Sequence, residues 1–228
     1  MDKKRFALRF LIYLAGMVIL ALGLTLSTRV SMGVSPVISI SAAFSGITGV
    51  NIGNTTFVLY CVLVVIQVIL RLIRKEYKAV IPTLLQLALS LIFTRFMNLF
   101  VAWIPNFATD CAGTWMGTIV GRVFFMLISI VLIGVGAATT LNMRLVPNPG
   151  DGMVQALSDC TGKSAGFCKN CLDLTCVAIA CLCGLIFSGK IHGVGVGTLC
   201  AMLLIGRVIS LFNHFVQKPM LRAAGMEK

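Results

Sequence analysis

The stretch Val146–Lys163, VPNPGDGMVQALSDCTGK, stands between long apolar segments and cannot itself cross a membrane. A related stretch, Val34–Val50 (VSPVISISAAFSGITGV), occurs earlier in the chain. When Pro36 is aligned with Pro149, 113 positions later, small and turn-forming residues stay in register without a gap. A match of this kind over roughly forty positions predicts an internal duplication. The matched pairs include Gly23 and Gly136, Ala43 and Ala156, Ser45 and Ser158, Thr48 and Thr161, and Gly49 and Gly162.

The composition excludes a disordered chain and argues against a soluble domain. Apolar residues make up 58% of the sequence and charged residues only 11%. Several apolar runs reach the roughly 20 residues that a helix needs to span a bilayer. The net charge of +12 falls in the termini and in the loops between these runs, where membrane orientation places it. We therefore expect membrane lipid as a partner and no nucleic acid.

We expect an all-α, polytopic membrane protein that forms a single transmembrane domain over residues 1–228, with about six transmembrane helices. Between the spans remain two short helices, which begin with Pro, suited to a first helical turn, and end at Thr-Gly, suited to a helix C-cap. Thirteen residues cover roughly 20 Å of a hydrocarbon core about 30 Å thick. The short helices are therefore predicted to be re-entrant half-helices; the alternative is that they are amphipathic and lie flat at the surface. The predicted spans are about residues 7–27, 54–73, 80–103, 117–141, 166–187 and 193–215, and the half-helices are residues 36–48 and 149–161.

The distribution of basic residues favours re-entry. With both half-helices re-entrant and both termini cytoplasmic, fourteen Lys and Arg residues lie inside, and only Arg29 and Lys190 lie outside. If both half-helices crossed, the ratio would fall to nine to seven, against the positive-inside rule. The two repeats, about residues 1–112 and 113–228, then have three spans each, so the second is inverted relative to the first. The fourteen are Lys3, Lys4, Arg5, Arg9, Arg71, Arg74, Lys75, Lys78, Arg144, Lys163, Lys169, Lys218, Arg222 and Lys228.

The starts of the two half-helices carry the candidate binding residues. Inverted repeats with broken helices are a recurring plan of transporters, whose site lies near the membrane midplane between the repeats. Asp151 at the start of the second half-helix is either a capping residue or a proton- or cation-coupling site. The neighbouring amide Asn148 either lines a polar path or bonds between helices. In the first half-helix, Ser35 and Ser39 offer hydroxyls instead.

Three charged residues within the predicted spans need partners or ligands. Asp173 and Arg207 fall at similar depth in antiparallel spans, and a lone charge there costs roughly 2.5–3.5 kcal/mol, so we predict that they pair. The pair is either a structural tie or a coupling and gating element. Arg95 has no such partner and either binds an anion or carboxylate beside a half-helix N-terminus or snorkels to the outer interface. Arg122 is expected to snorkel, and it could also neutralise Asp110.

No pattern in the chain predicts catalysis. Seven of the nine cysteines lie between Cys160 and Cys200, but no second pair or histidine stands at a zinc-ligand spacing. Most fall in apolar spans, where cysteine behaves as a small hydrophobe. No nucleophile motif, Walker loop, dinucleotide fingerprint or HExxH sequence occurs. We expect neither an enzyme nor a cofactor nor a metal site.

Several short motifs resemble a known family. The pattern RF-x-x-Y-x-x-G at Arg9–Gly16 and the run MGVSPVIS at Met32–Ser39 resemble the YczE-like bacterial membrane proteins. The run PGDGMVQALSDCTGK with Leu172-Asp173 also looks like the wider YitT-type group. The resemblance implies the bacterial cytoplasmic membrane and a transporter, and it brings no substrate. Members often carry an aromatic residue and an acid after the first Pro, whereas this chain has Val and Ile there, which puts a shared acidic role in doubt.

These observations predict a transporter or facilitator of a small solute, bound between the half-helices. Two positive helix ends together with Arg95 favour an anionic or zwitterionic solute. Two other classes stay open: a solute-binding membrane subunit of a larger uptake complex, and a non-transporting accessory or assembly protein. The sequence also leaves homo-oligomerisation open.

Overall fold

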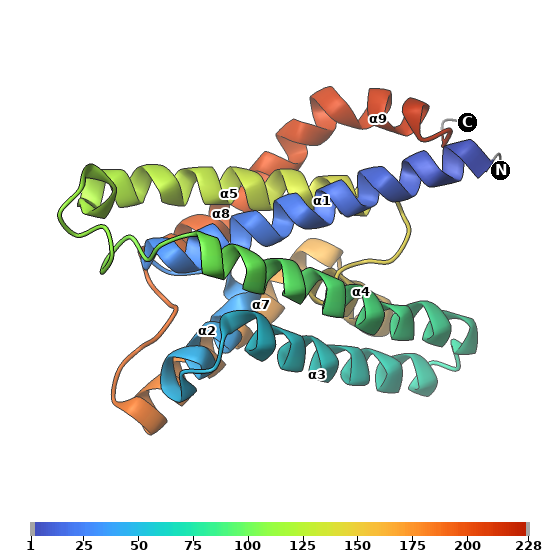
Figure 1. The fold of residues 1–228 in the computed structure, drawn as a ribbon. Helices are drawn as coiled ribbons and strands as arrows, with labels where there is room; N and C mark the ends of the chain where they lie inside the picture. Colours follow the sequence, from blue (N-terminus) through green and yellow to red (C-terminus); the bar gives the residue numbers. More distant parts are fainter. Residues whose placement is uncertain (1–2, 227–228) are drawn as a thin grey trace.

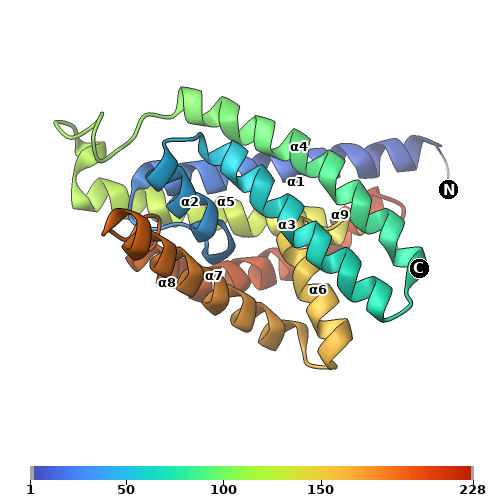
Figure 2. The ribbon, with the colours of Figure 1, turned by 90° about the horizontal axis from the view of Figure 1, so that it is seen from below.

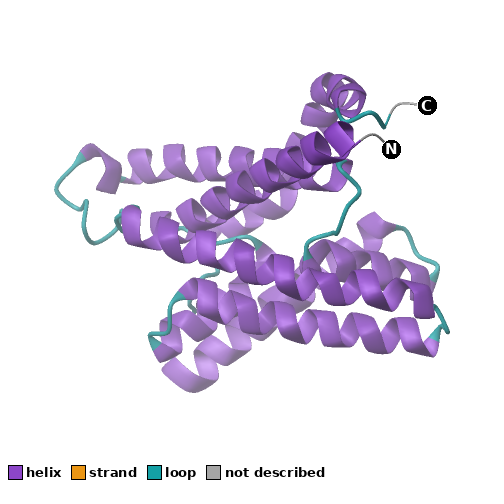
Figure 3. Ribbon diagram, turned by 45° about the vertical axis from the view of Figure 1, so that its right-hand side comes forward, coloured by secondary structure: helices purple, strands orange, loops and turns teal. Residues whose placement is uncertain are grey.

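The computed structural model describes residues 3–226. This part of the chain consists of helices joined by loops and contains no strand (Figure 3). Six of its helices are long and apolar enough to cross a membrane. Lys228, which the charge argument places inside, lies outside the described residues. The long helices are α1 (Lys3–Val30), α3 (Ile52–Ile73), α4 (Tyr77–Trp103), α5 (Ile119–Asn142), α7 (Ala165–Ser188) and α8 (Val196–Phe212), which continues through a π-helical turn (Asn213–Gln217) into α9 (Lys218–Ala223).

The two short helices have the predicted boundaries, α2 at Pro36–Thr48 and α6 at Pro149–Thr161. Proline occupies the first turn of each, where the missing N–H costs no hydrogen bond. Each ends at a glycine in the left-handed conformation, with φ of 72° at Gly49 and 67° at Gly162. A residue with a Cβ rarely adopts this φ, so Thr-Gly ends both helices.

The last long helix begins at Val196, three residues after the approximate start that we predicted. Residues Gly193–Gly195 stay outside α8 because their backbone pairs with the loop after α1. The N–H of Val34 donates to the carbonyl of Gly193 at 2.9 Å, and that of Gly197 donates to the carbonyl of Met32 at 2.8 Å. The glycines allow two backbones to meet where side chains would keep them apart.

Helices α1 and α5 pack against each other along most of their length (Figure 1). They cross at Gly23 and Gly136: a Cβ on Gly23 would lie 2.8 Å from the nitrogen of Ile133, and one on Gly136 would lie 2.5 Å from that of Leu20. Small residues at such crossings allow close packing of helices in membranes. The two contacts are equivalent under the duplication. Gly23 corresponds to Gly136 and Leu20 corresponds to Ile133, each 113 positions later, so each glycine meets the same position of the other half.

Helix α4 packs against α1, and α8 packs against α5. Helix α2 packs against α7 and α3, and α6 packs against α3 and α7 (Figure 2). Large apolar side chains cover much of the outer surface, and Ile73 and Ile119 expose 72% and 75% of their area. An outer surface with so many large exposed apolar side chains is unfavourable in water and suits contact with lipid.

Gly136→Ala should destabilise the protein, because its methyl group would press on the backbone of Leu20. Overpacking of this kind costs about 1–3 kcal/mol. Gly206→Ala in α8 is the matched control, because nothing lies within 4 Å of its Cβ and the change favours the helix by about 0.5–1 kcal/mol. Thermal unfolding in detergent measures both. Equal midpoints for the two variants would contradict the tight crossing.

Candidate functional site

The first turns of α2 and α6 meet at a cavity of about 80 Å³ inside the bundle. Ser35, Val37 and Ile38 of α2 line one side, and Asn148, Gly150, Asp151 and Val154 of α6 line the other. Tyr60 of α3 and Lys169 of α7 add two polar side chains. Apolar side chains of α1, α5 and α8 complete the wall, namely Leu20, Leu24, Ile133, Ala137, Ile205 and Ile209.

The two helix starts differ in how their N–H groups are satisfied. The side-chain oxygen of Asn148 accepts from the N–H of Gly150 at 3.2 Å and so caps α6. Ser35 occupies the same position in α2, but its side chain makes no capping hydrogen bond. The first N–H groups of a helix have no partner within the helix, and the helix dipole makes this end positive. The start of α2 therefore presents donors and positive potential to the cavity.

Acidic and basic side chains stand on the other side of the cavity. Asp151 lies in the first turn of α6, but Asn148 makes the capping bond that we considered for Asp151. The ammonium of Lys169 pairs with Asp173, one turn further along α7, with 3.0 Å between Nζ and Oδ2. The cavity thus combines a positive helix end, an ammonium and one carboxylate.

The predicted pair between Asp173 and Arg207 is wrong. Asp173 is buried and bonds Lys169, which the i, i+4 spacing places within reach on the same helix. Helix α8 packs mainly along α5, and Arg207 is exposed there. We had paired the two residues because they lie at similar depth in antiparallel helices, but α8 does not lie beside Asp173.

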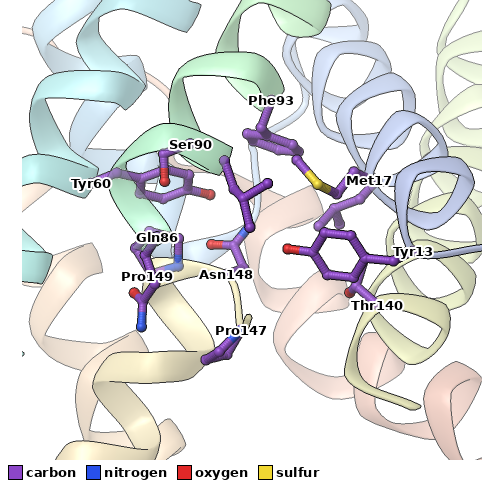
Figure 4. A pocket seen from close by; sticks show the side chains of 12 residues that line it. Tyr13, Met17, Tyr60, Gln86, Ser90, Phe93, Thr140, Pro147, Asn148 and Pro149 are labelled. Carbon is purple, nitrogen blue, oxygen red and sulfur yellow. The ribbon is translucent and has the colours of Figure 1, made fainter. Parts of the chain in front are cut away.

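A second, smaller cavity of about 20 Å³ adjoins the first, and Leu20, Tyr60 and Asn148 line both. Asn148 stands in its middle, and the hydroxyls of Tyr13 and Tyr60 point toward it from opposite sides (Figure 4). The Asn148 side chain faces the hydroxyl of Tyr60. Gln86 and Ser90 of α4 face the same space.

Two buried amides hold the start of α6. Gln67 donates from Nε2 to the carbonyl of Pro149 at 3.1 Å, and Gln86 donates from Nε2 to Oε1 of Gln67 at 3.1 Å. Both glutamines are almost completely buried. Gly152 leaves room for them, since a Cβ there would lie 2.5 Å from Oε1 of Gln67 and 2.7 Å from Nε2 of Gln86.

Arg9, which we placed on the cytoplasmic side, and Arg122, which we expected to snorkel, hold the segments before the short helices. Arg9 donates to the carbonyls of Met143 and Arg144 at 2.7 and 2.8 Å. Arg122 donates to the carbonyls of Val30 and Ser31 at 2.8 and 2.6 Å, and it bonds no carboxylate. A signal was present in the sequence, because Arg9 and Arg122 are themselves 113 positions apart.

The remaining predicted site residues lie outside the cavity wall. The hydroxyl of Ser39 donates to the carbonyl of Pro36 within α2 at 2.5 Å. Arg95 is exposed on α4 and lies 3.4 Å from Oδ1 of Asn54 on α3. Of the five residues predicted to bind a solute, the structure brings together Ser35, Asn148 and Asp151.

Six helices of membrane length and an apolar outer surface define an integral membrane protein, and a cavity with a few polar side chains lies between two of its helix ends. The chain belongs to the family of unknown function DUF6198, whose model matches residues 7–214.

Two relatives from Bacillus subtilis (strain 168) are similar over most of the chain. The uncharacterized protein YyaS is 24% identical over 214 residues, which cover 94% of this chain and 96% of YyaS. The uncharacterized membrane protein YczE is 24% identical over 208 residues, which cover 91% of this chain and 86% of YczE. The family agrees with the resemblance to YczE-like proteins seen in the motifs. No solved structure matches the chain.

Gly152→Ala should destabilise the start of α6, because its methyl group would displace Gln67 and Gln86 and break their link to Pro149. We expect a loss of about 1–3 kcal/mol, as for other overpacked sites. The control is Gly150→Ala on the same helix, whose Cβ would lie 3.5 Å from its nearest neighbour. Thermal unfolding separates the two, and a Gly152→Ala midpoint no lower than that of Gly150→Ala would refute the contact.

Proposed function

We propose that this chain is a transporter or facilitator of a small anionic or zwitterionic solute in the bacterial cytoplasmic membrane. The observation that carries the proposal is the cavity between the starts of α2 and α6. A negatively charged group of the solute would bind the uncapped start of α2 and the ammonium of Lys169. A positively charged group of the solute would bind the carboxylate of Asp151 at the start of α6.

An inverted duplication supports this function. Arg9 and Arg122 donate to carbonyls that are also 113 positions apart, Val30 with Met143 and Ser31 with Arg144. Ser31 and Arg144 both have positive φ, 57° and 47°. The two halves therefore share the geometry that ends their first helix, and not only a sequence pattern.

The ends of the short helices repeat as well. The hydroxyl of Ser45 donates to the carbonyl five residues later at 2.7 Å, and that of Ser158 does the same at 2.7 Å. Thr48 and Thr161 donate to the carbonyls four residues earlier, at 2.7 and 2.8 Å. Three spans in each half give the halves opposite orientations, so α2 and α6 enter from opposite faces, with both termini in the cytoplasm. Transporters of this plan alternate access by moving one repeat against the other around a fixed site.

The two routes into the cavity are closed by different contacts. An open cavity of about 590 Å³ beside the C-terminal half of α2 ends at Gly33 and Val34, and the inner cavity begins at Ser35. Val34 is 2% exposed and is held by its bond to Gly193. We assign this open cavity to the outer face, where parting of the Met32–Val34 segment from Gly193–Gly197 would admit the solute.

The route from the cytoplasmic face is closed by the segment that precedes α6. Arg9 holds the carbonyls of Met143 and Arg144, and the hydroxyl of Tyr13 donates to the carbonyl of Val146 at 2.8 Å. Release of these bonds would open the cavity inward. Contacts that close and open the two routes in turn suit a carrier better than a continuously open channel.

Single cysteines at Thr48 and Thr161, in a variant without native cysteines, should react with a membrane-impermeant thiol reagent from opposite sides. The two threonines occupy equivalent, exposed helix ends. Thr48→Cys should be labelled only from outside intact cells, and Thr161→Cys only after the cytoplasmic face is made accessible. Labelling of both cysteines from the same side of the membrane would contradict the inverted arrangement.

Asp151→Asn should abolish solute-driven current while leaving the protein folded, because the change keeps the shape and removes the charge in the cavity. Asp159→Asn is the control, since Asp159 lies two turns further along α6 and bonds Gln155 outside the cavity. Proteoliposomes on a solid-supported membrane, challenged with a panel of amino acids and small carboxylates, give the readout. A wild-type protein that responds to none of them, or equal currents in the two variants, would argue against the proposal.

A further inference from the structure

We propose that a groove between α2, α3 and α7 binds one anionic phospholipid, with an acyl chain in the groove and the headgroup phosphate on Arg95. The groove has a volume of about 570 Å³ and shares no residue with the two cavities at the start of α6. Its binding of a lipid does not depend on the proposed transport. The apolar side chains on its wall include Ile40 and Phe44 of α2, Val58 and Val62 of α3, and Ile179 of α7.

The surface of the groove is apolar, although some of its residues carry hydroxyls. Thr48 and Thr55 donate their hydroxyls to backbone carbonyls of α2, at 2.7 and 3.0 Å. Ser41 is only 1% exposed, whereas Val58 and Val62 expose 62% and 50% of their area. Because the hydroxyls bond or are buried within the protein, the groove suits a hydrocarbon chain better than a polar solute.

One end of the groove lies at the membrane interface. Helix α3 has 22 residues, about 33 Å in length, which matches a hydrocarbon core of about 30 Å. Asn54 is the third residue of this helix and lines the groove, and Val58 and Val62 follow one and two turns deeper. The groove therefore runs along α3 from headgroup depth into the core, over roughly 12 Å. An acyl chain takes the same direction in a bilayer.

Arg95 stands at the interfacial end of the groove. Its Nη1 lies 3.4 Å from Oδ1 of Asn54, and Nδ2 of Asn98 donates to the same oxygen at 3.0 Å. Arg95 and Asn54 are both exposed. With Oδ1 of Asn54 taken by these donors, its Nδ2 is left as a donor beside the guanidinium. A planar guanidinium with an amide next to it suits the oxygens of a phosphate.

Arg95 lacks the anion that a charge on a membrane helix needs. Within residues 3–226, no carboxylate forms an ion pair with it, whereas charges in spans tend to be paired. Arg9 and Arg122 differ from Arg95 because they donate to backbone carbonyls. The lipid headgroup layer supplies phosphates at the depth of Arg95, and an anionic lipid has no ammonium to compete for them.

A second copy of the chain is a poorer source of this anion. The sequence has 7 acidic residues against 19 basic ones. Among the described acids, only Asp110 falls on the outer side in our arrangement, and it already accepts from the N–H of Asn106 and the hydroxyl of Thr109, both at 2.8 Å. Charge complementarity therefore favours an anionic lipid over a second copy as the occupant.

The test is the thermal unfolding of the purified full-length protein in detergent, titrated with dioleoylphosphatidylglycerol, dioleoylphosphatidylcholine or glycerol 3-phosphate. We expect a saturable rise of the unfolding midpoint with the anionic lipid, a smaller rise with the zwitterionic lipid and none with glycerol 3-phosphate, which has no acyl chain. Arg95→Gln should weaken the apparent affinity for the anionic lipid about tenfold, which corresponds to 1.4 kcal/mol, and remove the preference between the lipids. Without lipid its midpoint should stay close to that of the wild type, because only the contact at 3.4 Å is lost.

Arg207→Gln is the matched control for the charge. Arg207 is exposed on α8, which does not line the groove, so this variant should keep the preference for the anionic lipid. Val58→Trp fills the groove and should reduce the response to both lipids. Val65→Trp is its control, because Val65 exposes 57% of its area on the same helix and does not line the groove.

Equal responses of the wild type to the two lipids, or equal losses in Arg95→Gln and Arg207→Gln, would overturn the headgroup site. A full lipid response in Val58→Trp would overturn the place of the acyl chain. A dimer in detergent that Val58→Trp converts to a monomer and Val65→Trp does not, measured by light scattering, would assign the groove to a second copy instead. These outcomes do not involve solute currents, so the lipid site and the proposed function can fail separately.

Discussion

The backbone carbonyls just beyond α1 and α5 are satisfied by two arginine side chains, and the position of both short helices depends on these bonds. Inside a membrane no water replaces a lost helical partner, so irregular backbone survives only where the protein supplies donors. Arg9 and Arg122 each supply two, at the same relative position of the two halves. With the chain ends of α1 and α5 fixed in this way, the prolines that follow begin α2 and α6 facing each other across one cavity.

The architecture repeats, but the chemistry does not. The residues that correspond to Asp151, Lys169 and Asp173 in the first half are Ile38, Thr56 and Tyr60, so every charge at the cavity comes from the second half. The first half contributes the uncapped start of α2 to the cavity, and its amides Gln67 and Gln86 hold the start of α6. An arrangement of this kind offers different groups on its two walls, which suits a solute with unlike ends better than a symmetric one.

The parts of this structure that follow from local rules could be predicted from the sequence. Proline at the first turn and glycine at the C-cap fix the ends of α2 and α6 within the chain itself. The partner of Asp173 could not be predicted, because it depends on which helices become neighbours, and α8 packs on α5. The role of Arg122 was missed for another reason: a snorkelling arginine and one that satisfies a helix end look alike in a sequence. Only its spacing of 113 residues from Arg9 distinguishes the two.

Asn148 lies two residues from the bond between Tyr13 and Val146, which helps to close the cytoplasmic route into the cavity. Its oxygen caps α6, its side chain faces the hydroxyl of Tyr60, and only Pro147 separates it from Val146, whose carbonyl accepts from Tyr13. Proline restricts the residue before it and its own φ, so this connection is stiff. A displacement of Asn148 that accompanies binding must therefore be taken up at the bond between Val146 and Tyr13, which is part of the inner closure. Occupancy of the site and closure of the inner route thus act on the same three residues.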